Sequence, residues 1–483
     1  PLSMASKVAN IAKNTSYFTL ALIIQKVISF SYFTLYARVL GPEDLGKYYF
    51  ALSFTSILSI LVDIGLANVL TREVAKTKDR AAQLLNNALA IKIPLAVVSM
   101  LIIMVVANLW GYSDLVKNLI YIAAVVMLLD SFTTLFFASM RGFHNLKYES
   151  FSAIAYQTIV LIISLIVLHY NWGLQWLMFS LLTASFLNCV YSGLVTVVKF
   201  KLRIRPQWDK VMVKYLFVTT IPFGLHAIFQ RLYTYADAVI LFKVAGDWAV
   251  GVYQVPFKIV MALQFLPGAF VAALYPAMSQ YWQENRGQLA VTFERAMNYS
   301  IIIGLPIMIG ITALADQIVL LFSEGYSTAI VPMQIMMLSL FLMFLSYPIG
   351  SLLNACDRQK QNTINMAITA IFSVALNLIL IPKLQVLGAA ITLTLSSLLL
   401  LILGWHYVPQ IVDYRFSKIA KVFGKALLAA LFMGVFVYSF KLELNIILNI
   451  IIGSLIYGVM LFLLGGFSKD DLQSVLKSFR TKI

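Results

Sequence analysis

The chain has 483 residues, of which 61% are hydrophobic and 12% are charged, and its net charge is +16. Ordinary soluble domains have roughly 45–50% apolar and 25% charged residues, because their surface needs polar cover. This composition excludes a soluble enzyme, a nucleic-acid-binding protein and a disordered chain, and it predicts an integral membrane protein. In a membrane protein, the distribution of the basic residues indicates which connections between spans lie on the cytoplasmic side of the bilayer.

Fourteen apolar segments follow one another along the chain, each with the roughly 20 residues that a helix needs to cross the hydrocarbon. They cover about residues 14–40, 44–70, 84–110, 115–140, 151–170, 174–200, 214–243, 248–278, 296–322, 330–353, 362–382, 386–409, 422–440 and 444–466. Transmembrane strands are excluded because they alternate over about ten residues. The predicted fold class is an all-α polytopic membrane protein with about 14 transmembrane helices and no soluble domain.

The basic residues predict the orientation of these spans. If the N-terminus is cytoplasmic, the inner connections and termini hold 26 Lys and Arg, and the outer connections and span ends hold 6. Cytoplasmic loops have such an excess, so we expect a multi-pass protein of the cell (plasma or inner) membrane with both termini in the cytoplasm. We also expect the native chain to begin at Met4 and to have no cleaved signal peptide.

Several charged residues fall inside the predicted spans. The basic ones are Lys26, Lys92, Arg231 and Lys258. The acidic ones are Asp63, Asp130 and Asp237. A charge at mid-membrane costs about 2.5–3.5 kcal/mol on an insertion scale, and such residues usually face the bundle interior or a water-filled cavity. Structural ion pairs, and side chains that extend to the membrane surface, are the alternative interpretation.

An internal repeat supports the functional interpretation of two of these residues. At an offset of 205, the following pairs coincide: Gln25-Lys26 with Gln230-Arg231, Gly41 with Gly246, Gly46 with Gly251, and Tyr48 with Tyr253. Six spans separate the equivalent segments, so both halves have the same orientation, as in transporters with parallel repeats. We therefore expect an N-terminal lobe at residues 1–205, a second lobe at 206–410, and two further spans with a cytoplasmic tail at 411–483.

Substrate sites of such transporters lie near the midplane between the repeats. We predict that Lys26 and Arg231 face one cavity and bind an anion, because a guanidinium matches phosphate and an ammonium is a mobile point charge. Gln25 and Gln230 could add hydrogen bonds. The intramembrane aspartates could bind H⁺ or Na⁺ for coupling or pair with the lysines, and we favour pairing. No phosphate loop or HExxH motif is present, so we expect no cofactor and no enzymatic activity.

Six segments resemble the Wzx-type polysaccharide flippases of the multidrug/oligosaccharidyl-lipid/polysaccharide (MOP) superfamily. They are residues 37–48 (ARVLGPEDLGKY), 63–66 (DIGL), 71–75 (TREVA), 354–360 (NACDRQK), 377–382 (NLILIP) and 387–390 (LGAA). The resemblance implies two pseudo-symmetric six-helix lobes plus two C-terminal helices, which alternate between inward-open and outward-open states. It also implies movement of a polyprenyl-pyrophosphate-linked oligosaccharide from the cytoplasmic to the outer leaflet.

Related lipid II flippases use cavity cations against the pyrophosphate. The resemblance carries that role onto Lys26 and Arg231, and more weakly onto Lys92 and Lys258. The expected partners are the lipid-linked oligosaccharide and membrane lipids, with no nucleic acid, and we expect a monomer. A MATE-like multidrug antiporter, which should have an acidic site and usually twelve spans, and a lipid II flippase stay open as alternatives. A membrane glycosyltransferase or polymerase is disfavoured by the short outer loops.

Overall fold

The computed structural model describes residues 4–466, apart from the side chains of residues 4–18, 222 and 223. The predicted cytoplasmic tail after residue 466 and the three residues before Met4 lie outside this range. Within it, all regular structure is helical, which confirms the predicted fold class.

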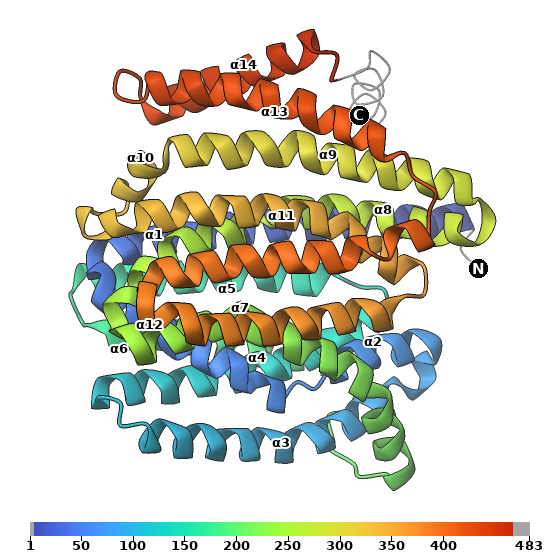
Figure 1. The fold of residues 1–483 in the computed structure, drawn as a ribbon. Coiled ribbons are helices and arrows are strands. Elements are labelled where there is room, and N and C mark those ends of the chain that lie inside the picture. Colours follow the sequence, from blue (N-terminus) through green and yellow to red (C-terminus); the bar gives the residue numbers. More distant parts are fainter. Residues whose placement is uncertain (1–3, 467–483) are drawn as a thin grey trace. The chain divides into compact units, whose positions relative to one another are not determined.

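The helices follow one another with short connections (Figure 1). The first seven are α1 (Met4–Leu58), α2 (Leu66–Lys76), α3 (Ala81–Leu109), α4 (Asp114–Gly142), α5 (Lys147–His169), α6 (Leu174–Val198) and α7 (Lys210–Leu263). The remainder are α8 (Phe265–Glu284), α9 (Arg286–Ala313), α10 (Ala315–Leu320), α11 (Ile330–Ala355), α12 (Gln359–Trp405), α13 (Phe416–Ser439) and α14 (Ile446–Leu463).

Three of these helices are too long for one crossing of a membrane. At 1.5 Å per residue, the 54 residues of α7 would span about 80 Å, more than twice the hydrocarbon thickness. Each long helix contains one residue with non-helical dihedral angles: Gly41 in α1, Gly246 in α7 and Gln385 in α12. The described residues contain 11 helical stretches that are long and apolar enough to span a membrane. Dividing the three long ones at these residues yields the predicted fourteen.

Some span boundaries differ from the prediction. The second span was expected to reach residue 70, but its helical structure ends at Leu61, and the chain turns before α2 begins. Gly65 occupies the left-handed region at φ 93°, which favours glycine, and it precedes the first residue of α2. The eighth and ninth predicted spans are also interrupted, at Gln264 and Leu314. Hydropathy alone does not detect such turns, because the residues around them are apolar.

The chain divides into two compact units that we describe separately. The first unit comprises the residues up to Gln254 together with Val374–Gln385, and the second comprises Val255–Ser373 and the residues from Val386 onward. The predicted lobes at 1–205, 206–410 and 411–483 stay a prediction.

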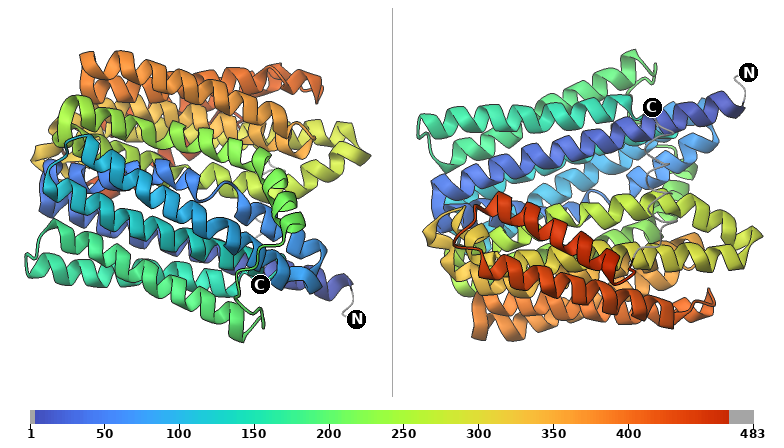
Figure 2. Two further views of the ribbon diagram at one scale, coloured as in Figure 1. Left: turned by 90° about the horizontal axis from the view of Figure 1, so that it is seen from below. Right: turned by 90° about the horizontal axis from the view of Figure 1, so that it is seen from above.

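In the first unit, α4 packs on α6, α1 packs on α5, and α3 lies beside α4 (Figure 1). The blue-to-cyan helices of this unit run side by side in the other two views as well (Figure 2). Because successive helices reverse direction, the connections at 77–80, 143–146 and 199–209 lie at the same end of the first unit. We call this end the basic end, because it is the one at which the sequence places most of the Lys and Arg residues. A buried apolar cluster that includes Leu70, Leu85 and Leu216 fills this end.

In the second unit, α9 packs between α11 and α13, and α13 lies beside α14 (Figure 1). The core contains Phe293, Leu305, Leu352 and Met433, which are all buried. Where these helices span the membrane, van der Waals packing of such apolar side chains against one another stabilises the unit.

The two turns of the sequence repeat have the same backbone conformation. Gly41 has φ 73° and ψ 176°, and Gly246, its equivalent at an offset of 205, has φ 84° and ψ −178°. A side chain would strain both positions, because L-residues rarely adopt this φ. Each glycine therefore lets two helical arms fold back on each other at the end opposite the basic end.

The same two hairpins touch each other through a second pair of glycines. A Cβ atom on Gly46 would overlap the carbonyl oxygen of Asp247, and a Cβ atom on Gly251 would overlap the carbonyl oxygen of Pro42. The two contacts are equivalent under the sequence repeat, because Gly46 and Pro42 correspond to Gly251 and Asp247 at the offset of 205. The backbones of the two hairpins are thus in reciprocal contact within the first unit, and only glycine permits this approach.

Candidate functional site

The first unit contains a partly open, partly polar cavity of about 200 Å³ between the second arm of α1, the turn that follows it, α4 and α7. It is lined by Leu52, Thr55, Ser56, Ser59, Asp63, Ala123, Val126, Met127, Asp130, Ser131, Thr134 and Arg231. Three of the sequence-predicted site residues, Arg231, Asp63 and Asp130, thus meet around one cavity.

Arg231 is the one basic residue in the lining of this cavity. Its Nη1 donates a long hydrogen bond of 3.5 Å to the carbonyl oxygen of Ser56. It makes no ion pair with any described residue. A guanidinium has five N–H donors in a planar fork, so most of them stay available to a ligand, and phosphate or carboxylate oxygens match that geometry.

Lys92 lies behind the cavity wall and does not line it. Its Nζ donates 2.7 Å to the carbonyl oxygen of Ser131 and is 3.4 Å from Oδ1 of Asp63. The side chain is 0% exposed, and Nζ lies 6.0 Å from the centre of the Phe132 ring. Lys92 is therefore engaged by the protein itself, and it connects α3 to α4 and to the turn that follows α1.

Asp130 lines the cavity without a cationic partner in the described part of the chain. Its Oδ1 accepts a hydrogen bond of 2.7 Å from Oγ of Ser185, which is also 3.3 Å from the hydroxyl of Tyr156. Because Lys92 balances Asp63, the remaining charges at the cavity are Arg231 and Asp130, one of each sign. The lining is therefore mixed, whereas a cationic cavity was expected.

Asp237 is 4% exposed and lies outside the cavity lining. Its carboxylate accepts hydrogen bonds from the Tyr253 hydroxyl and, at 2.7 Å, from the backbone N–H of Ala238. Both donors are neutral. The tyrosine follows the Gly246 turn and the aspartate precedes it, so this bond joins the two arms of the α7 hairpin.

The remaining predicted residues do not line the cavity. Lys26 is exposed on α1 and makes no side-chain hydrogen bond or ion pair with any described residue. Gln25 beside it is half-buried, and Gln230 is exposed. Lys258 belongs to the second unit and is half-buried. The shared pocket for Lys26 and Arg231 stays a prediction.

Sequence reasoning did not identify the hydroxyl groups that make this cavity polar. Thr55, Ser56 and Ser59 come from one arm of α1 and its continuation, and Ser131 and Thr134 come from α4. The signal was present as hydroxyl residues at helical spacing next to Asp63 and Asp130, but similar residues occur on many spans. Thr55 and Thr134 already donate to backbone carbonyls four residues earlier, so their lone pairs are available to accept hydrogen bonds.

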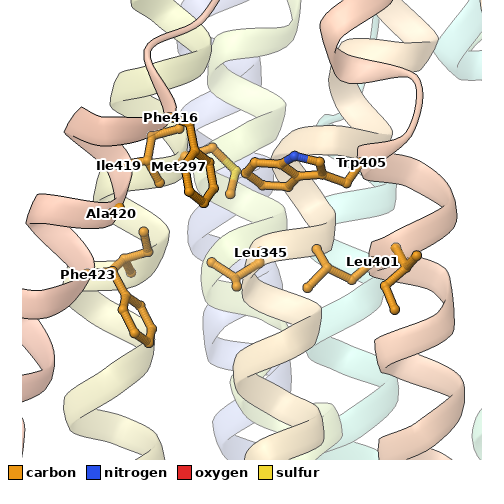
Figure 3. Close-up of a pocket in the computed structure, with 10 residues that line it drawn as sticks. Met297, Leu345, Leu401, Trp405, Phe416, Ile419, Ala420 and Phe423 are labelled. Carbon is orange, nitrogen blue, oxygen red and sulfur yellow. The ribbon is translucent and has the colours of Figure 1, made fainter.

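A second pocket, of about 330 Å³, lies in the second unit and is entirely apolar. In Figure 3 the side chains of Trp405, Phe416 and Met297 converge on it, with Phe423 and Leu345 further along. The indole N–H of Trp405 donates 2.8 Å to the hydroxyl of Tyr414. Since none of the lining groups can neutralise a charge, this pocket is not a candidate for a charged head group.

Among the described residues, no group of three or more His, Cys, Asp and Glu side chains could hold a metal ion. Cys189 and Cys356 are both free thiols.

Comparison with known proteins relates the chain to polysaccharide biosynthesis proteins. A family profile described as "Polysaccharide biosynthesis protein" matches residues 11–282, more than half of the chain, and one described as MatE matches residues 222–379. The chain is 20% identical over 408 residues to the capsular polysaccharide biosynthesis protein CapF of Staphylococcus aureus, covering 83% of this chain and 99% of CapF. It is 20% identical over 418 residues to the probable low-salt glycan biosynthesis flippase Agl15 of Haloferax volcanii, covering 84% and 85%.

Its fold is similar to the solved structure of the lipid II flippase MurJ in an inward closed conformation. The TM-score is 0.76 at 14% sequence identity, and the alignment covers 92% of this chain and 97% of MurJ. At that identity the likeness shows a shared fold.

Proposed function

Because the chain belongs to the polysaccharide biosynthesis protein family, a family of the MOP superfamily of membrane transporters, we propose that it is a flippase for lipid-linked oligosaccharides. It moves a polyprenyl-pyrophosphate-linked oligosaccharide from the cytoplasmic to the outer leaflet of the cell membrane. CapF and Agl15, whose names refer to capsular polysaccharide and to a glycan biosynthesis flippase, support this substrate class. The transport is not an enzymatic reaction.

The single observation that carries the proposal is the placement of Arg231. Its guanidinium belongs to the wall of a polar cavity and makes only one long hydrogen bond there. Facing oxygen atoms of a pyrophosphate, it would form charge-assisted bidentate hydrogen bonds. Asp130 and the hydroxyls of Thr55 and Ser56 would accept hydrogen bonds from sugar hydroxyls. Lys26, exposed on α1, would supply a second cation when the cavity widens.

The size of the cavity fits one stage of a transport cycle. About 200 Å³ is below the roughly 300–1,000 Å³ of typical ligand pockets, and too little for a pyrophosphate with several sugars. The cavity must therefore widen for the whole head group to enter, while the polyprenyl tail stays in the bilayer.

The orientation follows the basic residues, with the basic end and both termini in the cytoplasm. The reciprocal contacts of Gly46 and Gly251 then lie on the outer side and hold the two hairpins together. Export requires these hairpins to separate so that the cavity opens outward. Asp130 and Asp237, which have neutral hydrogen-bond donors, are the proposed carriers of a coupling H⁺ or Na⁺, while Asp63 is balanced by Lys92.

The test replaces Arg231 in cells that depend on this protein for surface glycan. Arg231→Ala should lower glycan export at least tenfold with normal amounts of folded protein in the membrane, and Arg231→Lys should retain part of the activity. Arg295→Ala is the matched control, because Arg295 is an exposed arginine in the second unit. Full export by the Arg231→Ala variant would contradict the proposed anion site.

A second candidate function is a MATE-like antiporter of organic cations. It is favoured by Asp63 and Asp130 in the cavity lining and by the MatE match over residues 222–379. Thermal stabilisation of the purified protein separates the candidates. A polyprenyl-pyrophosphate sugar should raise the melting temperature more than a cationic dye does, and lipid II serves as the third ligand. The reverse ranking would favour the antiporter.

A further inference from the structure

The connection between α6 and α7, residues 199–209 (KFKLRIRPQWD), lies at the basic end and has no regular secondary structure after the turn at residues 199 and 200. We call it the basic strap. It lies beside the start of α3, where Figure 1 draws it in green. Over residues 201–205 its side chains alternate between two environments, as in a strand. Leu202 is buried and Ile204 packs on the same apolar cluster, while Lys201, Arg203 and Arg205 are exposed.

Two adjacent asparagines of α3 hold the strap in place. The Asn86 side chain donates 3.0 Å to the carbonyl oxygen of Arg203 and accepts 2.9 Å from the backbone N–H of Arg205. Asn87, which is fully buried, accepts 2.8 Å from the backbone N–H of Asp209. These side chains, together with the carbonyl oxygen of Asn86 that accepts 3.2 Å from the backbone N–H of Gln207, supply hydrogen-bond partners to a segment outside regular secondary structure. These hydrogen bonds fix the backbone from which the basic side chains project.

The strap and the start of α7 carry a dense, unbalanced charge. The basic residues are Lys199, Lys201, Arg203, Arg205, Lys210 and Lys214, and all are exposed. None of these side chains makes an ion pair or a hydrogen bond within the described part of the chain. The one acidic residue between 199 and 214 is Asp209, and its Oδ1 accepts from backbone N–H groups at the start of α7.

Three other basic residues at this end have acidic partners. Arg141 makes a bidentate ion pair with Glu149 at 2.9 and 3.0 Å, and Arg72 and Lys76 both contact Glu73. The lack of counter-ions on the strap is therefore not general to this surface. Like charges fixed side by side repel each other, so an external anionic surface would stabilise the strap.

We propose that the basic strap is a docking site for the anionic headgroups of phospholipids in the cytoplasmic leaflet. The proposal rests on the proposed orientation of the chain. Polybasic segments next to a membrane span attract anionic lipids, and the indole of Trp208, which is 60% exposed, suits the membrane–water interface. The strap leads directly into α7, the helix that bears Arg231. A lipid bound to the strap would therefore contact the first residues of α7.

The test compares purified full-length protein in phosphatidylglycerol and in phosphatidylcholine nanodiscs. Phosphatidylglycerol should raise the melting temperature of the wild type by several degrees, and added salt should reduce this gain. The Lys201→Gln/Arg203→Gln/Arg205→Gln variant should lose most of the gain while melting like the wild type in phosphatidylcholine. If that variant does not fold, the single variants Lys201→Gln and Arg205→Gln should each lose part of the gain.

The matched control is Lys78→Gln/Arg80→Gln/Lys147→Gln, which removes three exposed charges from the same end of the first unit. It should keep the stabilisation. An unchanged gain in the strap variants, or an equal loss in the control, would overturn the proposal. Neither melting measurement depends on transport. Failure of the lipid-docking proposal can therefore be distinguished from failure of the proposed flippase function. Labelling of Gln207→Cys from one side of the membrane tests the orientation separately.

Discussion

The ion pair of Lys92 and Asp63 permits a quantitative test of a residue that sequence patterns assign to the substrate. Its ammonium is fully buried, 2.7 Å from a carbonyl oxygen and 3.4 Å from a carboxylate that is 22% exposed. Lys92→Met removes the cation and leaves the carboxylate without its partner. Breaking a fully buried pair costs about 3–5 kcal/mol. Because Asp63 retains some exposure, we expect a loss of about 2–4 kcal/mol in the free energy of unfolding.

The double variant Lys92→Met/Asp63→Asn should recover most of that loss, because no uncompensated charge remains. Equilibrium unfolding of the purified protein in mixed micelles measures the four members of this double-mutant cycle, and export in cells is measured in parallel. The expected coupling free energy is above about 1 kcal/mol, which is typical of residues in direct contact. A Lys92→Met protein that is as stable as the wild type but does not transport would refute the structural role and return Lys92 to the substrate site.

Three further predictions follow from backbone contact, acid titration and thiol burial. Gly251→Ala should destabilise the protein by about 1–3 kcal/mol and lower export, because the added methyl group would overlap a backbone carbonyl. Gly424→Ala is the control, because its methyl group would enter open space, and it should change neither stability nor export. Burial raises the pKa of the Glu73 carboxyl, but hydrogen bonds from basic neighbours and a tyrosine lower it more, so the pKa lies below its usual range. The stability that Glu73 contributes is present above its unfolded-state pKa and is lost as the pH falls through its folded-state pKa. Melting temperatures measured across the acid range should therefore depend less on pH in the Glu73→Gln variant than in the wild type. Burial raises the pKa of the Cys356 thiol to about 12, so iodoacetamide at pH 8 should label it only after unfolding; rapid labelling of the folded protein would contradict this burial.

Part of the candidate site could be predicted without coordinates. Arg231, Asp63 and Asp130 were selected because charges within apolar spans are costly, and they do line one cavity. The internal repeat singled out Arg231, and the role was carried to Lys92 only weakly, but the sequence did not show what Lys92 contacts. The structure gives Lys92 a carboxylate from the turn after α1 and a carbonyl oxygen from α4, and these contacts depend on tertiary packing.

The amino-acid sequence by itself determined the membrane class, the helical fold and the internal repeat. Long apolar runs and glycines at fixed spacing are local properties, and helices that satisfy their own backbone groups form from them without distant partners. Gly41 and Gly246, which differ by only 11° in φ, show how directly the repeat reappears in the backbone.

Only the tertiary structure decided which charges neutralise each other and which face a cavity. The partners of Lys92, Asp130 and Asp237 lie 29, 55 and 16 residues away along the chain, on arms and helices whose rotation about their own axes depends on packing. A rotation of one helix by a single residue, about 100°, would turn each side chain toward different neighbours. Hydropathy does not specify that rotation, because nearly every face of these helices is apolar.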